Sequence, residues 1–177
     1  EYYVRGTFTK HNLDFSEDVF SLYDEGFDQI SVEPVVCEPE APYALTEKEL
    51  SAIFSEYERL SARILENEKH GGKFNFFHFM LDLDQGPCAI KRLRGCGCGN
   101  EYVAITPDGD IYPCHQFVGL EEYKMGNLDE GTFNLDMKAE FAASHVYTKP
   151  ECKKCWAKFY CSGGCNANNY IYAGDIH

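Results

Sequence analysis

Four cysteines near the end of the chain are the residues best suited to bind a metal. They fall within fourteen residues, with gaps of two, five and three: Cys152, Cys155, Cys161 and Cys165. Thiolates are soft ligands, and several at this spacing can surround a metal centre only if the backbone between them turns back sharply. Gly163 and Gly164 permit that turn, because glycine takes positive φ without steric cost. The spacing therefore predicts a metal site, with a zinc knuckle or two structural disulfides as the alternatives.

A second group of cysteines lies upstream, at Cys96, Cys98 and Cys114. Residues 101–105 and 110–112 have the composition of strands, and the Thr-Pro-Asp-Gly sequence between them predicts a turn. Antiparallel pairing would bring the Cys96 or Cys98 end beside Cys114. The alternative is a hairpin that contains buried free cysteines.

The number of thiols bears on the kind of metal. A closed structural zinc site takes four ligands, whereas the two groups offer seven thiols and Cys88 adds another. Two centres that share ligands from distant segments are therefore expected. Iron–sulfur clusters suit this arrangement, since each takes about four cysteines from scattered positions.

Composition and charge narrow the class of protein. The 177 residues, 15% of them aromatic, suit one globular domain or two small ones. Nine cysteines without an export signal indicate reduced thiols, so we expect a cytoplasmic protein. A net charge of −13 disfavours nucleic acid as a partner, and the sequence lacks an apolar run of about 18 residues that would cross a membrane.

The first third of the chain predicts a βαβ unit and hence a parallel sheet. Residues 1–10 and 27–36 have strand composition, and Ser16 is a suitable N-cap for a helix over residues 17–25. The carboxyl end of the second strand and the loop at 37–45 that follows it contain three candidates for a ligand site: Glu33 in the strand, and Cys37 and Glu38 in the loop. A solvated loop is the alternative interpretation.

A long helix is expected next, because Thr46 and Glu49 form a capping-box pattern and Gly71-Gly72 ends the periodicity. Its apolar stripe is predicted to pack in the core and comprises Leu50, Ile53, Phe54, Tyr57, Leu60, Ile64 and Leu65. Residues 74–83 predict a buried strand or helix, in which His78 is expected to be a hydrogen-bonded core residue. The composition changes near residue 86, which predicts domains at 1–85 and 86–177.

These cysteines resemble a known pattern. The cysteine pattern resembles that of the SPASM domain of radical SAM peptide and protein maturases. In this pattern Cys96 is followed after twelve residues by Gly109 and after four more by Cys114, and the Cys-x2-Cys-x5-Cys-x3-Cys run comes later. Further motifs resemble the maturases of SCIFF (six cysteines in forty-five) peptides, among them Phe-His-Phe-Met at 77–80 and Tyr-Pro-Cys-His-Gln-Phe-Val-Gly at 112–119. Residues 1–40 resemble the late strands of the partial barrel of the same enzymes.

The resemblance implies an α/β fold: the C-terminal part of a partial (β/α) barrel, followed by a cysteine-rich SPASM domain with a β-hairpin and helices around two auxiliary 4Fe-4S clusters. It implies an oxidoreductase that uses S-adenosylmethionine on a third 4Fe-4S cluster. Such an enzyme joins a cysteine sulfur to a threonine α-carbon in a ribosomally made precursor peptide (a RiPP). The implied partners are this cysteine-containing peptide and a reducing electron donor.

The resemblance also implies ligands. The first auxiliary cluster would take Cys96, Cys114 and Cys165, and the second would take Cys152, Cys155 and Cys161. Either Cys88 or Cys98 would complete the first cluster, or its fourth iron would be left open for a substrate thiolate.

The chain departs from the family pattern in two places. It contains no Cys-x3-Cys-x2-Cys loop for the SAM cluster, and no seventh SPASM cysteine follows Cys165. We therefore expect a portion of a longer enzyme that is inactive on its own. Two rival interpretations are a zinc-ribbon binding module and a ferredoxin-like electron carrier.

Overall fold

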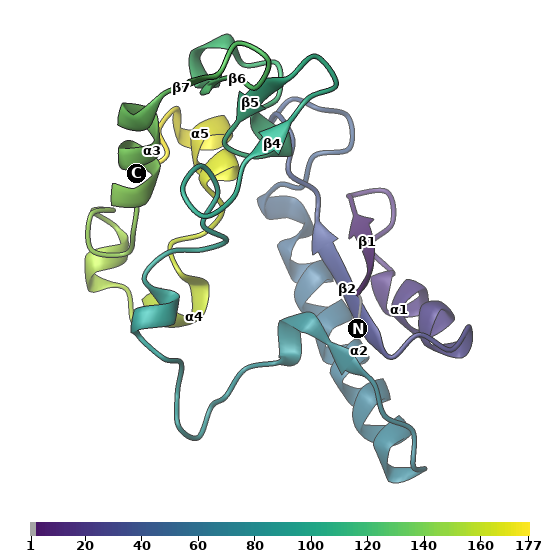
Figure 1. Ribbon diagram of the computed structural model, residues 1–177. Helices are drawn as coiled ribbons and strands as arrows, with labels where there is room; N and C mark the ends of the chain where they lie inside the picture. Colours follow the sequence, from purple (N-terminus) through teal and green to yellow (C-terminus); the bar gives the residue numbers. More distant parts are fainter. Residues whose placement is uncertain (1–2) are drawn as a thin grey trace. The chain divides into compact units, whose positions relative to one another are not determined.

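The computed structural model describes residues 3–177, which form two compact units (Figure 1). The first unit ends at Leu81 and the second begins at Asp82. Each unit has its own sheet and its own buried core, so each is described by itself.

The first unit contains a three-stranded parallel sheet in the order β1-β2-β3. Its strands are β1 (Val4–Phe8), β2 (Gln29–Pro34) and β3 (Asn75–Phe76). Helix α1 (Phe15–Asp24) connects β1 to β2, and α2 (Leu50–Lys69) lies between β2 and β3 (Figure 1). The predicted βαβ unit is thus confirmed for the described residues; the first two residues of the predicted first strand lie outside them.

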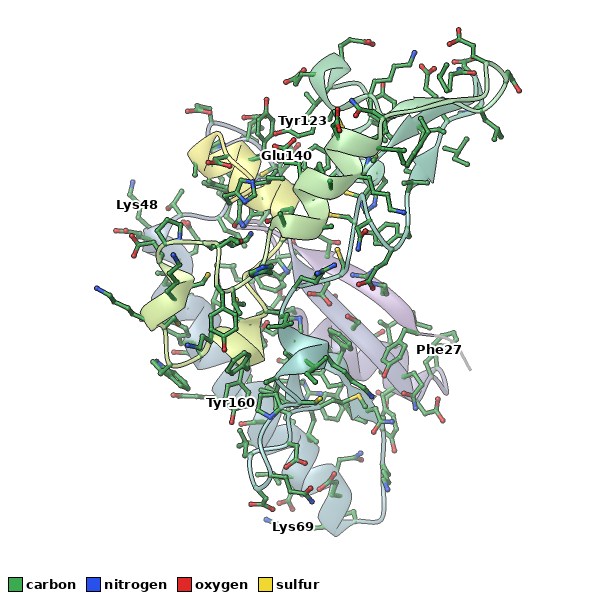
Figure 2. The ribbon with its side chains drawn as sticks, turned by 60° about the vertical axis from the view of Figure 1, so that its left-hand side comes forward. Phe27, Lys48, Lys69, Tyr123, Glu140 and Tyr160 are labelled. Carbon is green, nitrogen blue, oxygen red and sulfur yellow. The ribbon has the colours of Figure 1, made fainter. Side chains whose placement is uncertain are left out.

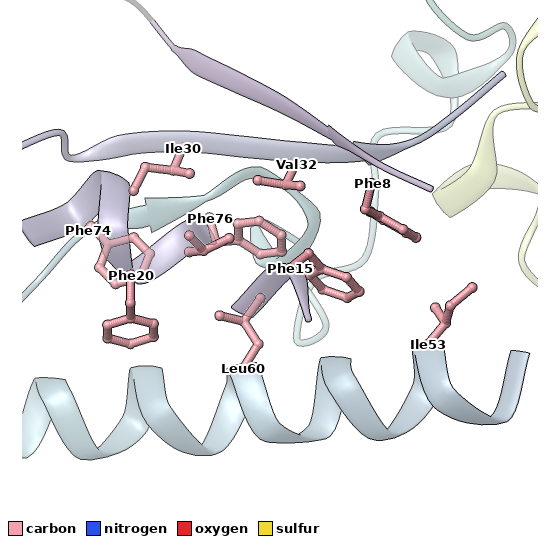
Figure 3. Packing of buried hydrophobic residues seen from close by; sticks show 10 residues of the cluster. Phe8, Phe15, Phe20, Ile30, Val32, Ile53, Leu60, Phe74 and Phe76 are labelled. Atoms are coloured by element: carbon pink, nitrogen blue, oxygen red, sulfur yellow. The ribbon is translucent and has the colours of Figure 1, made fainter. Parts of the chain in front are cut away.

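Alternate residues of β2 build the core of this unit. Ile30 and Val32 face the side chains of α2, where Leu60 is fully buried (Figure 3). Three residues of the predicted apolar stripe do not join them: Leu50, Phe54 and Leu65 are 44%, 62% and 59% exposed. The prediction was wrong there because only part of the stripe contacts the core: Ile53 and Leu60 are buried in it, and Tyr57 and Ile64 pack against it.

The N-terminus of α1 is capped by a side chain from α2. Asp14 is the N-cap residue, and Ser16, the predicted N-cap, lies inside the helix. The Ser16 backbone N–H donates to Glu56 Oε1 at 3.0 Å, and the Ser16 hydroxyl donates to the same oxygen. Glu56 is buried and pairs with Arg59 at 3.1 Å. A carboxylate at this position satisfies the free N–H groups of the helix end and complements its dipole.

The capping box before α2 is confirmed. Thr46 N–H donates to Glu49 Oε2 at 2.8 Å, and Lys48 N–H donates to the Thr46 hydroxyl at 3.3 Å. The box starts a 3-10 turn, η1 (Glu47–Glu49), from which α2 continues.

The segment after α2 is less buried than predicted. Only Asn75–Phe76 form a strand, and a 3-10 turn, η2 (Phe77–Phe79), follows. Phe77, Met80 and Leu83 are 52%, 51% and 76% exposed. The run of apolar residues does not extend the core because the chain leaves the sheet after two residues.

His78 is hydrogen-bonded, as predicted, but it is half-buried and is not part of the core. It joins α2 to the end of β2. Its Nδ1 lies 2.7 Å from the Tyr57 hydroxyl and its Nε2 lies 2.7 Å from Glu33 Oε2. The hydrogen bond with His78 lowers the pKa of Glu33, and burial raises the pKa of Tyr57 to about 12. Glu33 is therefore an ionised acceptor at neutral pH, and Tyr57 keeps its proton and donates to His78.

The second unit contains a four-stranded antiparallel sheet. Its strands are β4 (Ala104–Ile105), β5 (Asp110–Tyr112), β6 (Gly126–Asn127) and β7 (Thr132–Phe133), and its helices are α3 (Leu135–Ala143), α4 (Lys158–Cys161) and α5 (Asn166–Ala173). Strands β4 and β5 form the predicted hairpin, and Gly109 in its turn has φ of 80°. Among the described residues, no helix has the length and apolarity required to cross a membrane.

Aromatic rings and cysteines share the core of the second unit. The rings of Phe117 and Phe141 pack edge to face with centroids 5.5 Å apart, and Tyr123 lies beside α3 near Glu140 (Figure 2). Cys98 and Cys114 belong to the same buried cluster. Gly99 also approaches this cluster, since a Cβ at that position would stand 2.6 Å from Phe141 Cγ. The segment that carries Cys98 is thus packed directly against α3.

We expect Glu33→Gln to destabilise the first unit near neutral pH but not in acid. The lowered pKa of Glu33, below its usual 4.5, means that its ionised form stabilises the fold above the unfolded-state pKa. This stabilisation of about 1 kcal/mol disappears as the pH falls through the folded-state pKa. Hydrogen exchange of β2 amides, corrected for intrinsic rates, measures it across this range. The exposed Glu38→Gln is the control, and an identical pH profile for both variants would contradict the expectation.

We expect Gly99→Ala to destabilise the second unit more than Gly131→Ala. Both glycines have positive φ, 73° and 65°, so both substitutions introduce backbone strain of about 1 kcal/mol or more. Only Gly99→Ala also displaces Phe141, because nothing lies within 4 Å of a Cβ at Gly131. Overpacking adds about 1–3 kcal/mol, which thermal unfolding followed by near-ultraviolet circular dichroism would detect. Equal losses for the two variants would show that Phe141 does not restrict this segment.

Candidate metal centre

Three of the predicted ligands come together at Cys98. The thiols of Cys114 and Cys96 both lie close enough to the Cys98 thiol to affect its ionisation. These two thiols, together with burial, raise the pKa of Cys98, whereas the nearby Cys98 thiol, whose single hydrogen can be donated to either neighbour, lowers the pKa of Cys96 and of Cys114. Cys98 and Cys114 are 3% and 4% exposed, and Cys96 is exposed. The arrangement favours thiolates at two positions, and the thiolate is the form that binds metal.

The hairpin places these thiols together, as predicted. The Gly99 N–H donates to the Pro113 carbonyl at 3.0 Å, which fixes the Cys98 segment beside the end of β5. Gly97 takes φ of 76° between Cys96 and Cys98, so the chain turns between the two thiols. The Tyr102 hydroxyl donates to Cys96 Sγ at 3.4 Å.

The second cysteine group lies on two short helical turns. Cys152 begins the 3-10 turn η6 (Cys152–Lys154), and Cys155 N–H donates to the Cys152 carbonyl at 3.1 Å. Cys161 ends α4. Burial raises the pKa of Cys152, and negative charge on Cys161 and Cys155 raises it further, so the three thiols lie within electrostatic reach of one another.

The backbone between Cys161 and Cys165 turns back in the way that the two glycines predicted. Ser162, Gly163 and Gly164 all have positive φ, at 61°, 84° and 76°. Ser162 is the only non-glycine residue with positive φ among those that the structure describes. Its hydroxyl is buried and has no hydrogen-bond partner there. An unpaired buried hydroxyl beside a cysteine requires an explanation, and a group bound by these thiols would supply an acceptor.

The loop before Cys165 approaches the Cys98 segment. A Cβ at Gly95 would stand 2.9 Å from the Gly164 carbonyl oxygen. A small cavity of about 10 Å³ lies between these segments, and its lining residues are Arg94, Gly95, Cys96, Gly97, Cys98, Phe141, Ser144, Gly164 and Asn166. The tertiary structure thus brings the chain next to Cys165 to the three hairpin thiols.

The sequence analysis did not identify a buried lysine in this region. Lys149 is 4% exposed, and its Nζ donates to the Ile176 carbonyl at 2.8 Å and to Asn166 Oδ1 at 3.0 Å. Asn166 Nδ2 in turn lies 3.7 Å from Cys98 Sγ. A single lysine three residues before a cysteine has no distinctive pattern, so nothing in the sequence indicated that it is buried.

The remaining candidates lie outside this arrangement. Cys88 is exposed, and hydrogen bonds from the backbone of Lys91 and Ile90 lower its pKa. Burial raises the pKa of Cys37, which is half-buried in the first unit. Glu33 is hydrogen-bonded to His78.

The donor set suits iron–sulfur clusters in its chemistry, because thiolates are their usual ligands. The positive-φ loop after Cys161 and the unpaired Ser162 hydroxyl also fit a bound group. Within residues 3–177, no three His, Cys, Asp or Glu side chains are grouped closely enough to hold a single metal ion. The structure therefore brings together the segments that carry the ligands, and a cluster would have to draw its thiolates from more than one of them.

A family model describes much of the second unit. Residues 96–156 match SPASM, an iron–sulfur cluster-binding domain. This segment contains five of the predicted ligands, namely Cys96, Cys98, Cys114, Cys152 and Cys155.

Curated relatives include anaerobic sulfatase-maturating enzymes. A cysteine-type enzyme of Clostridium perfringens is 37% identical over 85 residues, which are 43% of this chain and 22% of that protein. A serine-type enzyme of Klebsiella aerogenes is 34% identical over 74 residues, 40% of this chain and 18% of that protein. An uncharacterised protein of Archaeoglobus fulgidus is 26% identical over 121 residues, 64% of this chain and 29% of that protein. The chain thus spans less than a third of the length of these relatives.

Solved structures share the fold. The structure of anSMEcpe with bound AdoMet matches with a TM-score of 0.68 and 20% identity, over 94% of this chain and 46% of that one. The same protein with AdoMet and the Cp18Cys peptide matches with a TM-score of 0.66 and 20% identity, over 94% of this chain and 48% of that one. The predicted α/β fold is confirmed by this match. Residues 96–156 therefore match an iron–sulfur cluster-binding SPASM domain, and the chain as a whole shares its fold with part of the AdoMet-binding enzyme anSMEcpe.

Proposed function

We propose that the second unit holds auxiliary iron–sulfur clusters and that Cys96, Cys98, Cys114 and Cys165 are the ligands of the first. The observation that carries this proposal is the grouping of three cysteines inside the SPASM segment: Cys98 shares a buried cluster with Cys114 and lines one cavity with Cys96. It favours Cys98 over Cys88 as the fourth ligand, since the described contacts of Cys88 are with the backbone of Lys91 and Ile90.

We assign Cys152, Cys155 and Cys161 to a second cluster. Their nearness along two short helical turns supports one shared centre, since Cys155 N–H donates to the Cys152 carbonyl and both Cys155 and Cys161 affect the pKa of Cys152. The positive-φ residues after Cys161 direct the chain away from this centre toward Cys165. Neighbouring thiols on one loop would thus serve different clusters.

Two side chains orient the sulfurs of the first centre. Tyr102 donates to Cys96 Sγ and Asn166 donates to Cys98 Sγ. Hydrogen bonds to a thiolate favour its charged form and restrict its rotation. When bound, 4Fe-4S clusters supply electron transfer.

For the whole enzyme, we propose maturation of a cysteine-containing, ribosomally made peptide, using S-adenosylmethionine and a reducing electron donor. The reaction would form a bond between a cysteine sulfur and a threonine α-carbon and break the S–H and Cα–H bonds. S-adenosylmethionine would be the two-electron oxidant: it would be cleaved to methionine and 5′-deoxyadenosine, which takes up the α-carbon hydrogen, and the thiol hydrogen would leave as a proton. The SCIFF-like motifs support this substrate, and the peptide bound to anSMEcpe supports a peptide-sized ligand. We also infer a reducing, cytoplasmic setting, because a chain with nine cysteines that serve as thiolate ligands suits a compartment that keeps thiols reduced.

A second candidate is maturation of a sulfatase. It is favoured by the 37% identity with a cysteine-type anaerobic sulfatase-maturating enzyme. The two candidates are separated by offering the full-length enzyme either a cysteine- and threonine-containing peptide or a sulfatase peptide. Mass spectrometry would identify the substrate by a new cross-link in the first or a modified single residue in the second.

We expect Cys98→Ser to lower the iron and acid-labile sulfide content of the anaerobically reconstituted chain, because it removes a ligand of the first cluster. Cys88→Ser is the matched control, and this variant should keep the full content of iron and of acid-labile sulfide. Iron and sulfide assays, together with the visible absorption spectrum, measure the difference.

The rival interpretations predict other results. A colourless protein that contains only zinc would support the zinc-ribbon module and contradict the cluster proposal. Equal iron in the two variants would contradict the assignment of Cys98. A ferredoxin-like carrier predicts that ligand substitutions in the full-length enzyme leave peptide modification unchanged.

A further inference from the structure

Lys149 has an environment that is unusual for a cation. It is 4% exposed, yet none of the ion pairs among the described residues includes it. Its two acceptors, the Ile176 carbonyl and Asn166 Oδ1, are neutral. Burying an ammonium costs several kcal/mol unless an opposite charge lies nearby, so a negative partner must be sought.

Cysteines are the groups near Lys149 that become negative when they bind a cluster as thiolates. Burial lowers the pKa of the Lys149 ammonium, and Cys152, Cys98, Cys161 and Cys165 would act in the opposite direction as thiolates. These residues come from both proposed ligand sets. The ammonium therefore lies within electrostatic reach of the thiols of both centres, and no carboxylate forms an ion pair with it among residues 3–177.

Contacts fix Lys149 to both cysteine-bearing segments. Its Cδ and Cε lie 3.4 Å from the position that a Cβ of Gly163 would occupy, so its stem packs on the loop between Cys161 and Cys165. Its Nζ holds Asn166, whose amide reaches Cys98 Sγ. The Ser144 hydroxyl donates to the same Ile176 carbonyl at 2.9 Å. The lysine head group is thus positioned by packing and hydrogen bonds and does not move freely in solvent.

We propose that Lys149 is an electrostatic positioning residue of the metal centre: its buried ammonium balances the negative charge of the cysteine-bound clusters and raises their reduction potential. This inference rests on the proposed cluster-binding function. A fixed positive charge at low dielectric favours the reduced, more negative state of a cluster, and net charge is one of the factors that set cluster potentials.

The test compares Lys149→Gln, Lys149→Met and Lys153→Met in the reconstituted full chain. Lys149→Gln removes the charge but keeps an N–H donor, and Lys149→Met removes both while keeping similar volume. Lys153 is the matched control, because it lies next to Cys152 but is exposed, so solvent screens its charge. Iron and sulfide are measured first, followed by the midpoint potentials from a redox titration monitored by electron paramagnetic resonance.

We expect Lys149→Gln to keep its iron and to shift at least one midpoint potential to more negative values, with Lys153→Met close to the wild type. A second result would also support the proposal: both Lys149 variants lose iron, although circular dichroism shows that their chains remain folded in chelator. The bound clusters would then require the positive charge of Lys149. Unchanged potentials in an iron-loaded Lys149→Gln chain would overturn the proposal. Unfolding of both variants in chelator would also overturn it, because Lys149 would then be a structural residue. Absence of iron from the wild type would instead contradict the proposed function itself.

Discussion

The second unit depends on a group of connected polar side chains in its interior that includes no carboxylate. Cys98, Asn166, Lys149 and the Ile176 carbonyl form one connected set of hydrogen bonds, in which Cys98 and Lys149 are buried and Asn166 is half-buried. Each member would be costly to bury alone, and each is satisfied by the next. This set joins the hairpin segment to α5 and to the residues after it. The arrangement of the thiols and the stability of the unit therefore depend on the same contacts.

The aromatic residues of this unit and two of its cysteines also share one buried core. Phe117, Phe141, Cys98 and Cys114 belong to the same buried cluster, and Gly99 allows Phe141 to approach the Cys98 segment. A small unit has little interior, so packing and ligand placement compete for the same space. Here they coincide, because the chain that carries the ligands also lines the core.

The first unit orders its polar groups differently. Ile30 and Val32 of β2 point into the core, and Ser31 and Glu33, on alternate positions, point to the opposite face. At the carboxyl end of this strand, Ser31 and His78 both donate to Glu33, and Tyr57 reaches it through His78. One strand end, one helix and the turn after β3 are thereby connected. This polar end of a parallel strand is where α/β folds commonly place ligands.

Local sequence determined several features of this protein. The capping box at Thr46, the Thr-Pro-Asp-Gly turn and the βαβ unit follow from backbone geometry that a few neighbouring residues specify, and all are present. The pairing of the Cys98 segment with Cys114 also followed from hairpin geometry. The tertiary structure alone decided which apolar residues of α2 are buried, since Leu60 contacts the sheet and Phe54 does not. It also decided that Glu56 caps α1, that Cys98 and not Cys88 touches the other hairpin thiols, and that Lys149 is buried among the cysteine segments. Burial and long-range contacts depend on how distant segments pack, and no spacing of residues along the chain specifies that.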